Sequence, residues 1–258
     1  MYYKNVREDS KQEMVYGIRP VIEALRAGKE VEKAFVQRGV RSEAFRKLIS
    51  LFKEYEIPFQ VVPVEKLNKL TRKNHQGVVA YISPVTFCNI ENIIPQLYEQ
   101  GKEPFFLILD RITDVRNFGA LLRTAVSAGV HAVIIPSKGS AQLNSGTVKS
   151  SAGAIYKINI CRAHNIKNVI EYLKASGIKV AAATEKSSIP YFEQNLSGPL
   201  AIIMGSEGEG VSKEYLKKSD IKLKIPMMGE IESLNVSVAG GVLMYEVLRQ
   251  RLSVNKKQ

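Results

Sequence analysis

Short, continuous apolar runs separated by helical patterns constrain the fold of this chain more than any other feature of its sequence. In the C-terminal part the runs are Phe105–Asp110, Ala132–Pro136, Val180–Thr184 and Leu200–Met204. Strands that are buried on both faces of a parallel sheet have this character, and helical stretches at about 117–129 and 165–176 lie between the runs. The sequence therefore predicts an α/β fold with a parallel sheet, which ends in a helix from about Leu234 to Leu252.

A second, shorter α/β pattern comes first in the chain, from about Tyr16 onward. Helical spacing of apolar residues predicts helices at 18–27, 42–55 and 64–70, and strands are expected at 33–37, 59–63 and 78–82. This alternation favours a small α/β sandwich. The predicted organisation is a tail at 1–13, an N-terminal domain at 14–84, a proline-bounded linker at 85–104 and a larger domain at 105–258.

The chain of 258 residues is strongly basic, with a formal net charge of +12. Residues 1–84 hold 16 basic and 10 acidic residues and the rest hold 21 and 15, so each part carries +6 and the shorter part is the more densely charged. Such a charge usually indicates a nucleic-acid partner, although a merely soluble basic surface is the alternative.

The cysteine content and the apolar runs bear on the cellular compartment. The two cysteines give neither a disulfide framework nor the spacing of metal ligands. The first residues lack the apolar stretch of a signal peptide, and no apolar run has the length of a membrane span. We therefore expect a cytoplasmic protein with no membrane partner.

Three loops stand out because each follows a strand-like segment, and ligands of open α/β sheets bind at the carboxyl ends of strands. The first loop, Leu109–Gly129, has Asn117 where a helix is expected to start and Arg123 within the helix. One interpretation of Asn117 is a helix N-cap. Arg123, in the apolar stretch GALLRTAVSAG, is expected either to extend to solvent or to pair with an anion.

The other two loops are rich in glycine and small polar residues. The second, MGSEGEGVS (Met204–Ser212), has the order G-x-x-G-x-G, which is not the dinucleotide fingerprint. Its Glu207 is, by itself, compatible with an ordinary solvated loop residue. The third loop spans Ile225–Arg251 and offers Ser233 as a natural N-cap for the last helix. The pair Gly240 and Gly241 weakens that helix, which suggests that another backbone packs closely there.

Taken together and in this order, the three loops resemble the SpoU (TrmH) family of RNA ribose 2′-O-methyltransferases, in the SPOUT superfamily. The resemblance extends from about Tyr16 to Arg251. The phrases VYGIRPVIEAL, HQGVVA, GVHAVIIP, SAQLNS, MGSEGEGV and SLNVSVA resemble the subgroup that methylates a guanosine 2′-hydroxyl in bacterial large-subunit ribosomal RNA. The resemblance implies a SPOUT-type parallel sheet with a C-terminal trefoil knot, a small N-terminal RNA-binding domain of ribosomal-protein type, and a homodimer whose RNA site forms between subunits.

The resemblance also implies roles for particular residues. The implied catalytic residues are Asn117, Arg123, Glu207, Ser233 and Asn235. The implied methyl donor is S-adenosylmethionine, without a metal, at Thr184, Met204, Gly205, Gly210, Ile225, Met227 and Leu234. The family usually has Asp-Pro where this chain has Asp114-Val115, and proline would make that loop more rigid.

Methyl transfer from a sulfonium to a hydroxyl requires the donor and the oxygen to be held about 3 Å apart and aligned. Because a guanidinium is protonated at neutral pH, we expect Arg123 to bind a phosphate or the developing alkoxide, with Asn117 and Glu207 holding Arg123 and the ribose. Two alternatives stay open, namely the same chemistry on tRNA or on an antibiotic-resistance site of rRNA, and a non-catalytic RNA-binding assembly factor. A nicotinamide-dependent oxidoreductase is disfavoured, since no G-x-G-x-x-G follows the first strand.

Overall fold

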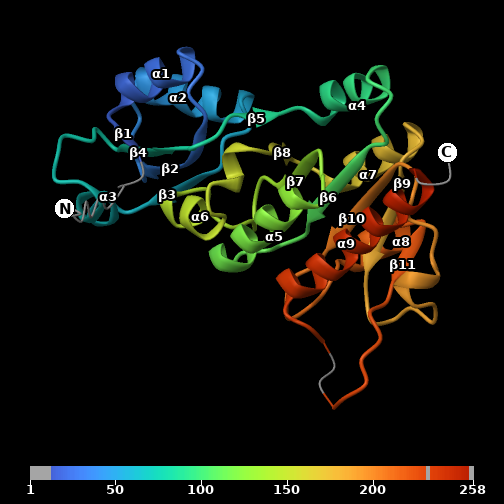
Figure 1. Ribbon diagram of the computed structural model, residues 1–258. Helices are drawn as coiled ribbons and strands as arrows, with labels where there is room; N and C mark the ends of the chain where they lie inside the picture. The colour runs from blue at the N-terminus through green and yellow to red at the C-terminus, as the bar shows by residue number, and fades with distance from the viewer. Residues whose placement is uncertain (1–12, 231–232, 256–258) are drawn as a thin grey trace, which may run out of the picture. The chain divides into compact units, whose positions relative to one another are not determined.

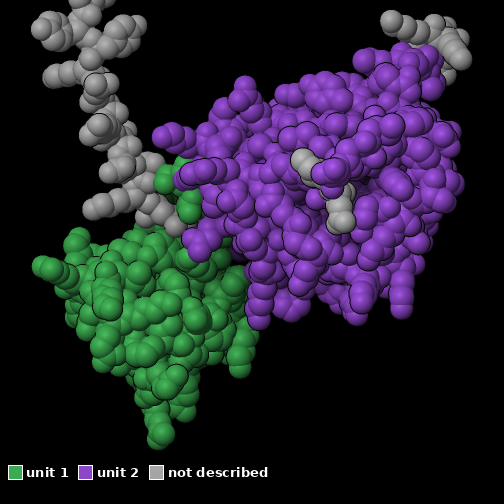
Figure 2. Space-filling model, turned by 90° about the horizontal axis from the view of Figure 1, so that it is seen from below, with its two compact units in different colours: residues 1–84, 143–145 green, residues 85–142, 146–258 purple. Residues whose placement is uncertain are grey.

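The computed structural model describes residues 13–230 and 233–255, which form two compact units (Figure 1). The smaller unit runs to Pro84 and also contains Leu143–Ser145, and the larger unit holds Val85–Gln142 and the chain from Gly146 onward, as the colours of Figure 2 show. Residues 1–12 of the expected tail lie outside the described part.

The smaller unit is built on a four-stranded sheet in the order β1-β4-β2-β3. Its strands are β1 (Met14–Tyr16), β2 (Val31–Gln37), β3 (Phe59–Val62) and β4 (Val78–Ile82). Helices α1 (Ile18–Arg26) and α2 (Glu43–Glu54) pack their apolar residues on one sheet face, and α3 (Val64–Leu70) packs on the other. The expected helices and strands are therefore confirmed to within two residues, and β1 is an addition.

The larger unit contains a seven-stranded sheet in which every neighbouring pair is parallel. The strands, in spatial order, are β11 (Ile221–Leu223), β9 (Lys179–Ala183), β10 (Leu200–Met204), β6 (Phe105–Leu109), β7 (Ala132–Pro136), β8 (Asn159–Ala163) and β5 (Phe87–Cys88). The four apolar runs are thus confirmed as four adjacent strands, and the expectation of a parallel α/β fold is confirmed with them.

Helices cover both faces of this sheet (Figure 1). They are α4 (Ile90–Glu99), α5 (Val115–Ser127), α6 (Ser145–Ser150), α7 (Ile166–Ala175), α8 (Lys213–Lys218) and α9 (Val236–Asn255), with short 3-10 turns η1 (Ala154–Tyr156) and η2 (Tyr191–Glu193). One core joins α4 and α7 to alternate strand residues, while α5 and α9 pack against each other. In Figure 1, α5 and α9 lie in front of the sheet, and their mutual packing bears on the site described below.

The segment 85–104, expected as a linker, carries β5 and α4. Strand β5 pairs with β8 as an edge of the large sheet. Helix α4 is capped by Asn89, whose side chain accepts a hydrogen bond from the Glu91 amide. Its apolar residues fall at helical spacing and are buried in the core of the larger unit, namely Ile90, Ile93, Ile94 and Leu97. The segment is therefore an integral part of the larger unit.

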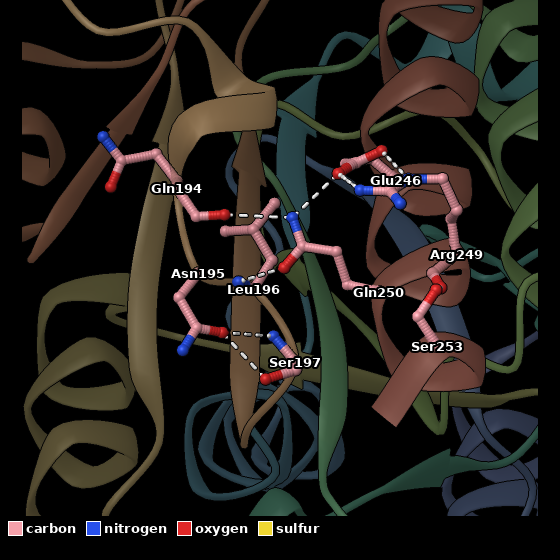
Figure 3. A network of polar contacts seen from close by, with 8 residues as sticks. All are labelled: Gln194, Asn195, Leu196, Ser197, Glu246, Arg249, Gln250 and Ser253. Carbon is pink, nitrogen blue, oxygen red and sulfur yellow. Dashed lines mark hydrogen bonds and ion pairs between the residues drawn. The ribbon is translucent and has the colours of Figure 1, made fainter. Parts of the chain in front are cut away.

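The C-terminal half of α9 is bound to the loop before β10 by a network of polar contacts (Figure 3). The Gln250 side chain bridges this loop, since its Oε1 accepts from the Leu196 amide at 2.8 Å and its Nε2 donates to the Gln194 carbonyl at 2.9 Å. Glu246, which is buried, accepts hydrogen bonds from Gln250 and Arg249. These contacts fix α9 along the sheet.

Gly240 and Gly241 lie where α9 meets α5. A Cβ on Gly240 would come within 2.4 Å of the Leu121 side chain, whereas one on Gly241 would make only ordinary contact with Thr124 at 3.9 Å. The expectation that another backbone presses on this pair was wrong, because the neighbour is a side chain of α5.

No helix within the described residues combines the length and the apolar character that crossing a membrane requires.

Candidate active site

A cavity of about 380 Å³ lies at the carboxyl ends of the strands in the larger unit. Strands β9, β10 and β11, together with the segment that leads into α9, supply its walls. All seven positions expected to hold the methyl donor line it: Thr184, Met204, Gly205, Gly210, Ile225, Met227 and Leu234. Glu207 and Ser233 line it as well. Segments as far apart in the sequence as Ala183 and Ala239 therefore meet around one space.

The loop after β10 is closed tightly on itself. The Gly210 amide donates to the Ser206 carbonyl at 2.9 Å, and Gly210 has a left-handed φ of 66°. A Cβ on Gly205 would lie 2.0 Å from backbone atoms of Gly210 and Val211. Since backbone cannot move aside as a side chain does, only glycine fits at 205, and the loop presents main-chain groups to the cavity.

Three polar side chains, one from each loop, meet beside the cavity, and we call them the polar triangle (Asn117, Glu207 and Asn235). Glu207 Oε1 accepts from Asn117 Nδ2 at 2.8 Å and from Asn235 Nδ2 at 2.7 Å. Asn235 Nδ2 also lies 3.0 Å from Asn117 Oδ1, to which it donates. The Glu207 carboxylate thus joins the start of α5, the glycine-rich loop after β10 (Gly205–Ser212, the glycine loop) and the start of α9.

The helix starts near the triangle are capped by residues other than those expected. The N-cap of α5 is Asp114, whose side chain accepts from the amides of Arg116 and Asn117, so the N-cap interpretation of Asn117 was wrong. Because Asp114 satisfies these amides, the side chain of Asn117 is free to reach Glu207. Val115 is the first helical residue, a position that favours proline. The residue that differs from the family's Asp-Pro is therefore Val115, the first residue of the helix, and the capping Asp114 is retained.

Asn235, not Ser233, caps α9. Its carbonyl accepts from the Ala239 amide at 2.9 Å, and its Oδ1 accepts from the Ser237 amide at 2.9 Å. Ser233 lies before the helix, exposed on the cavity wall, so its N-cap interpretation was wrong. Asn235 thus combines two tasks: its oxygen caps the helix and its nitrogen joins the polar triangle.

Arg123 is not brought to the polar triangle within this chain. Its side chain is exposed, and its guanidinium makes no hydrogen bond or ion pair with any residue in the described part of the chain. Six helical residues at about 100° each place it roughly 120° around α5 from Asn117. The expectation that Asn117 and Glu207 hold Arg123 is therefore not met inside one chain.

A further set of polar contacts, which the sequence reasoning missed, fixes the glycine loop to the end of β6. Asp110 is buried, and its Oδ2 accepts from the Ser212 amide at 2.7 Å and from the Ser212 hydroxyl at 2.6 Å. Arg111 donates to Asp110, to Glu209 and to the Gly210 carbonyl. The signal in the sequence is an aspartate that directly ends the apolar run FFLIL.

Arg111 adopts a left-handed φ of 60°, which costs a non-glycine residue about 1–2 kcal/mol. Its contacts offset that cost and aim the side chain across the loop. Burial alone would lower the pKa of Arg111, but its hydrogen bonds to Glu209 and Asp110 outweigh burial and raise that pKa. The guanidinium therefore stays charged and holds the glycine loop against the end of β6.

The lining of the cavity suits a small molecule that carries a positive charge. Its volume lies within the roughly 300–1,000 Å³ of typical ligand sites. Of its three carboxylates, Glu209 is paired with Arg111 and Glu185 with Lys186. Among the described residues, Glu207 bonds only to neutral amides, so its negative charge is left to favour a positively charged sulfonium. The apolar part of the wall consists of Met204, Leu223, Ile225, Val236 and Ala239. The residues present thus fit S-adenosylmethionine.

Fold and cavity together define an α/β enzyme class that binds a small ligand at the carboxyl edge of a parallel sheet. Comparison with known proteins gives the family. Residues 104–245 match the SpoU rRNA Methylase family, and residues 14–88 match the RNA 2′-O ribose methyltransferase substrate-binding family. The chain belongs to the SpoU rRNA methylase family, and it is an RNA 2′-O-methyltransferase that uses S-adenosylmethionine.

Three relatives illustrate the match. A protein of Staphylococcus saprophyticus, named for the TrmH family of tRNA/rRNA methyltransferases, is 36% identical over 95% of this chain and 98% of its own length. The structure of an AdoMet-bound rRNA methyltransferase from Sinorhizobium meliloti is 25% identical, with a TM-score of 0.59, over 94% of this chain and 89% of that one. A TrmH/SpoU tRNA-modifying enzyme of A. aeolicus is 29% identical, with a TM-score of 0.54, over 64% of this chain and 85% of that one.

Proposed function

We propose that the chain methylates the ribose 2′-hydroxyl of a guanosine in large-subunit ribosomal RNA. The observation that carries the site is the polar triangle (Asn117, Glu207 and Asn235), which joins all three loops beside the cavity. The guanosine and large-subunit assignments are supported by the sequence phrases that resemble that subgroup.

The choice of ribosomal RNA over tRNA is supported by how much of the chain each relative matches. The S. meliloti rRNA methyltransferase matches 94% of this chain, whereas the A. aeolicus tRNA-modifying enzyme matches only 64%. The smaller unit makes up about a third of this chain. A relative that matches nearly the whole chain has a counterpart of this unit, so the substrate of that relative is the better guide. Methylation of tRNA is the second candidate, because relatives of nearly full length are named for both RNAs.

In the proposed mechanism, the bound donor supplies an electrophilic methyl group on a sulfonium. The carboxylate and amides of the polar triangle orient the ribose so that its 2′-oxygen is aligned with that methyl group. Transfer of the methyl group to the 2′-oxygen would leave the donor as a neutral thioether, and the hydroxyl proton would pass to solvent. Asp110, Arg111 and Ser212 hold the glycine loop in place, so the cavity is preorganised and little rearrangement is needed.

Arg123 enters this mechanism through a second copy of the chain. Because its guanidinium points to solvent, away from the polar triangle of its own chain, we propose that it reaches the site of a partner copy in a homodimer. There it would bind a phosphate or the developing alkoxide of the substrate. The proposed path of the chain is the family's trefoil knot, in keeping with the return of α9 from edge strand β11 to pack on α5.

The test is transfer of radiolabelled methyl groups from S-adenosylmethionine to unmodified ribosomal RNA and to tRNA, followed by mapping of alkali-resistant positions. We expect one labelled guanosine in large-subunit RNA. The variant Asn117→Ala should lose at least about tenfold in rate, since one triangle contact and the ribose alignment are removed, and Arg123→Ala should lose at least as much.

The matched control is Arg116→Ala, which removes another exposed arginine from the same helix and should retain most of the activity. Transfer to tRNA alone would overturn the ribosomal substrate. Transfer at an unchanged rate by Asn117→Ala would overturn the role of the polar triangle.

A further inference from the structure

The sheet of the smaller unit has one face that α1 and α2 cover and one that α3 covers only in part. Residues on this second face include three aromatic side chains that are partly exposed, which we call the aromatic face (Tyr16, Phe35 and Tyr81). They come from three adjacent strands, β1, β2 and β4. The rings of Phe35 and Tyr81 meet edge to face, with centroids 6.2 Å apart.

Three lysines place their ammonium groups over these rings. Lys33 Nζ lies 5.5 Å from the centroid of Phe35 and 5.4 Å from that of Tyr81. Lys66 Nζ lies 4.9 Å from the Phe35 centroid, and Lys73 Nζ lies 5.6 Å from the Tyr16 centroid. The lysines come from a strand, a helix and a loop, so separate elements gather positive charge on one apolar platform.

These three lysines are not held in ion pairs by the residues that the structure describes. None of the three lysines forms an ion pair with a carboxylate in the described part of the chain. The segment from α3 into the following loop holds four basic residues against one acid: Lys66, Lys69, Arg72 and Lys73 against Glu65. Burial is the largest effect on the pKa of Lys33 and lowers it, while of the two nearby charges the attraction of Glu32, which raises that pKa, outweighs the repulsion of Lys66. An anion held between Lys33 and Lys66 would relieve the repulsion between those two ammonium groups.

We propose that the aromatic face with Lys33, Lys66 and Lys73 binds an unpaired stretch of the RNA substrate, with the lysines turning from the rings to the phosphates and the bases stacking on the rings in their place. The proposal rests on the RNA substrate of the proposed function and adds which face of the smaller unit holds it, and in what form. Stacking requires a base whose flat face is open, and a duplex has already buried those faces. Single-stranded RNA is thus the partner that can use both the charge and the rings.

The first test removes the positive charges by replacing each lysine with glutamine, which is neutral but still polar and unbranched. In the full-length protein, the triple variant K33Q/K66Q/K73Q is compared with R46Q/K47Q/K53Q, which removes three exposed charges from α2 on the opposite sheet face. The probe is a fluorescent single-stranded uridine dodecamer, titrated over a range of salt concentrations. Three lost phosphate contacts should reduce the slope of log K against log salt by about 2, and the α2 variant should reduce it much less. Equal slopes for the two variants would overturn the proposal.

The second test separates stacking from charge. The variant Tyr81→Leu keeps an apolar side chain but no aromatic face, and it should weaken binding of the uridine dodecamer by about tenfold while leaving binding of an RNA duplex of the same length unchanged. Equal weakening for the duplex, or none for the single strand, would contradict the stacking mode. Any folding defect in this variant leaves the lysine comparison to decide the proposal.

Affinity for S-adenosylmethionine, measured by calorimetry, should be the same in all these variants, because the donor cavity belongs to the larger unit. A wild-type protein that binds the single strand through these lysines but methylates only tRNA would overturn the proposed ribosomal substrate and leave this surface standing. If instead the protein methylates ribosomal RNA and K33Q/K66Q/K73Q has the same salt dependence as the α2 variant, the proposed ribosomal substrate stands and the proposed RNA-binding surface is overturned.

Discussion

At the scale of single residues, the site shows how much chemistry the sequence reveals without geometry. The positions carried over for the methyl donor all line one cavity, and three of the five expected catalytic residues form the polar triangle. Sequence spacing could not reveal that Asp114 and Asn235 are the true helix caps, since asparagine, aspartate and serine are nearly equivalent as caps. It also could not reveal the Asp110–Ser212 contact, which joins residues 102 positions apart.

The glycine at 205 gives a sharp prediction at this scale. Gly205→Ala should lower the affinity for S-adenosylmethionine by at least about tenfold, because the new methyl group would collide with backbone of the same loop and shift it, at about 1–3 kcal/mol. Calorimetric titration of the donor measures the effect. Gly198→Ala is the control, since it lies just before strand β10, outside the cavity lining, with open space around its Cβ and a φ outside the left-handed region. Affinities within twofold of each other for the two variants would contradict the prediction.

At the scale of elements, strong patterns were predicted well and short elements were not. Each five- or six-residue apolar run became a strand because burial on both faces leaves a clear signal in the sequence. Strand β8 was missed because Asn159 and Arg162 interrupt its apolar character, and β5 and β11 are too short to show a pattern. These strands form by pairing with neighbours that are distant in sequence, and a local window does not contain that information.

The contact between α5 and α9 is the element-scale feature most open to test. Gly240→Ala should lower the free energy of unfolding by about 1–3 kcal/mol, because its methyl group would press on the fully buried Leu121. Gly241→Ala should instead raise it by up to about 1 kcal/mol, since the site has room and alanine favours the helix. Urea denaturation of both variants gives the comparison. If the two variants change the free energy of unfolding by the same sign and amount, helix propensity alone determines the effect, and the packing of α5 on α9 does not contribute.

At the scale of the whole molecule, the exposed Arg123 leads to a prediction about assembly. If each site takes Arg123 from the partner copy, mixed dimers of Arg123→Ala and Glu207→Ala contain one intact site out of two. Random co-assembly of these two inactive variants should then recover about a quarter of the wild-type activity, since half of the dimers are mixed. Methyl transfer by the co-expressed, differently tagged variants measures this recovery.

Co-assembly of Glu207→Ala with Asn235→Ala is the matched control. Both residues belong to the polar triangle of one chain, so no mixed dimer restores a complete site and no activity should return. Recovery in both mixtures, or in neither, would contradict a site shared between copies.

The position of α9 after every strand of the large sheet has a consequence for synthesis. A nascent chain that stops short of residue 235 has every strand of the large sheet, but it lacks the last corner of the polar triangle and the helix that packs on α5. Such a chain has no complete site, and the apolar surface that α9 covers in the finished protein faces water. Catalytic competence and protection from aggregation therefore both wait for the segment from Asn235 through α9, so a product terminated before it is inactive and at the same time recognisable to chaperones and proteases.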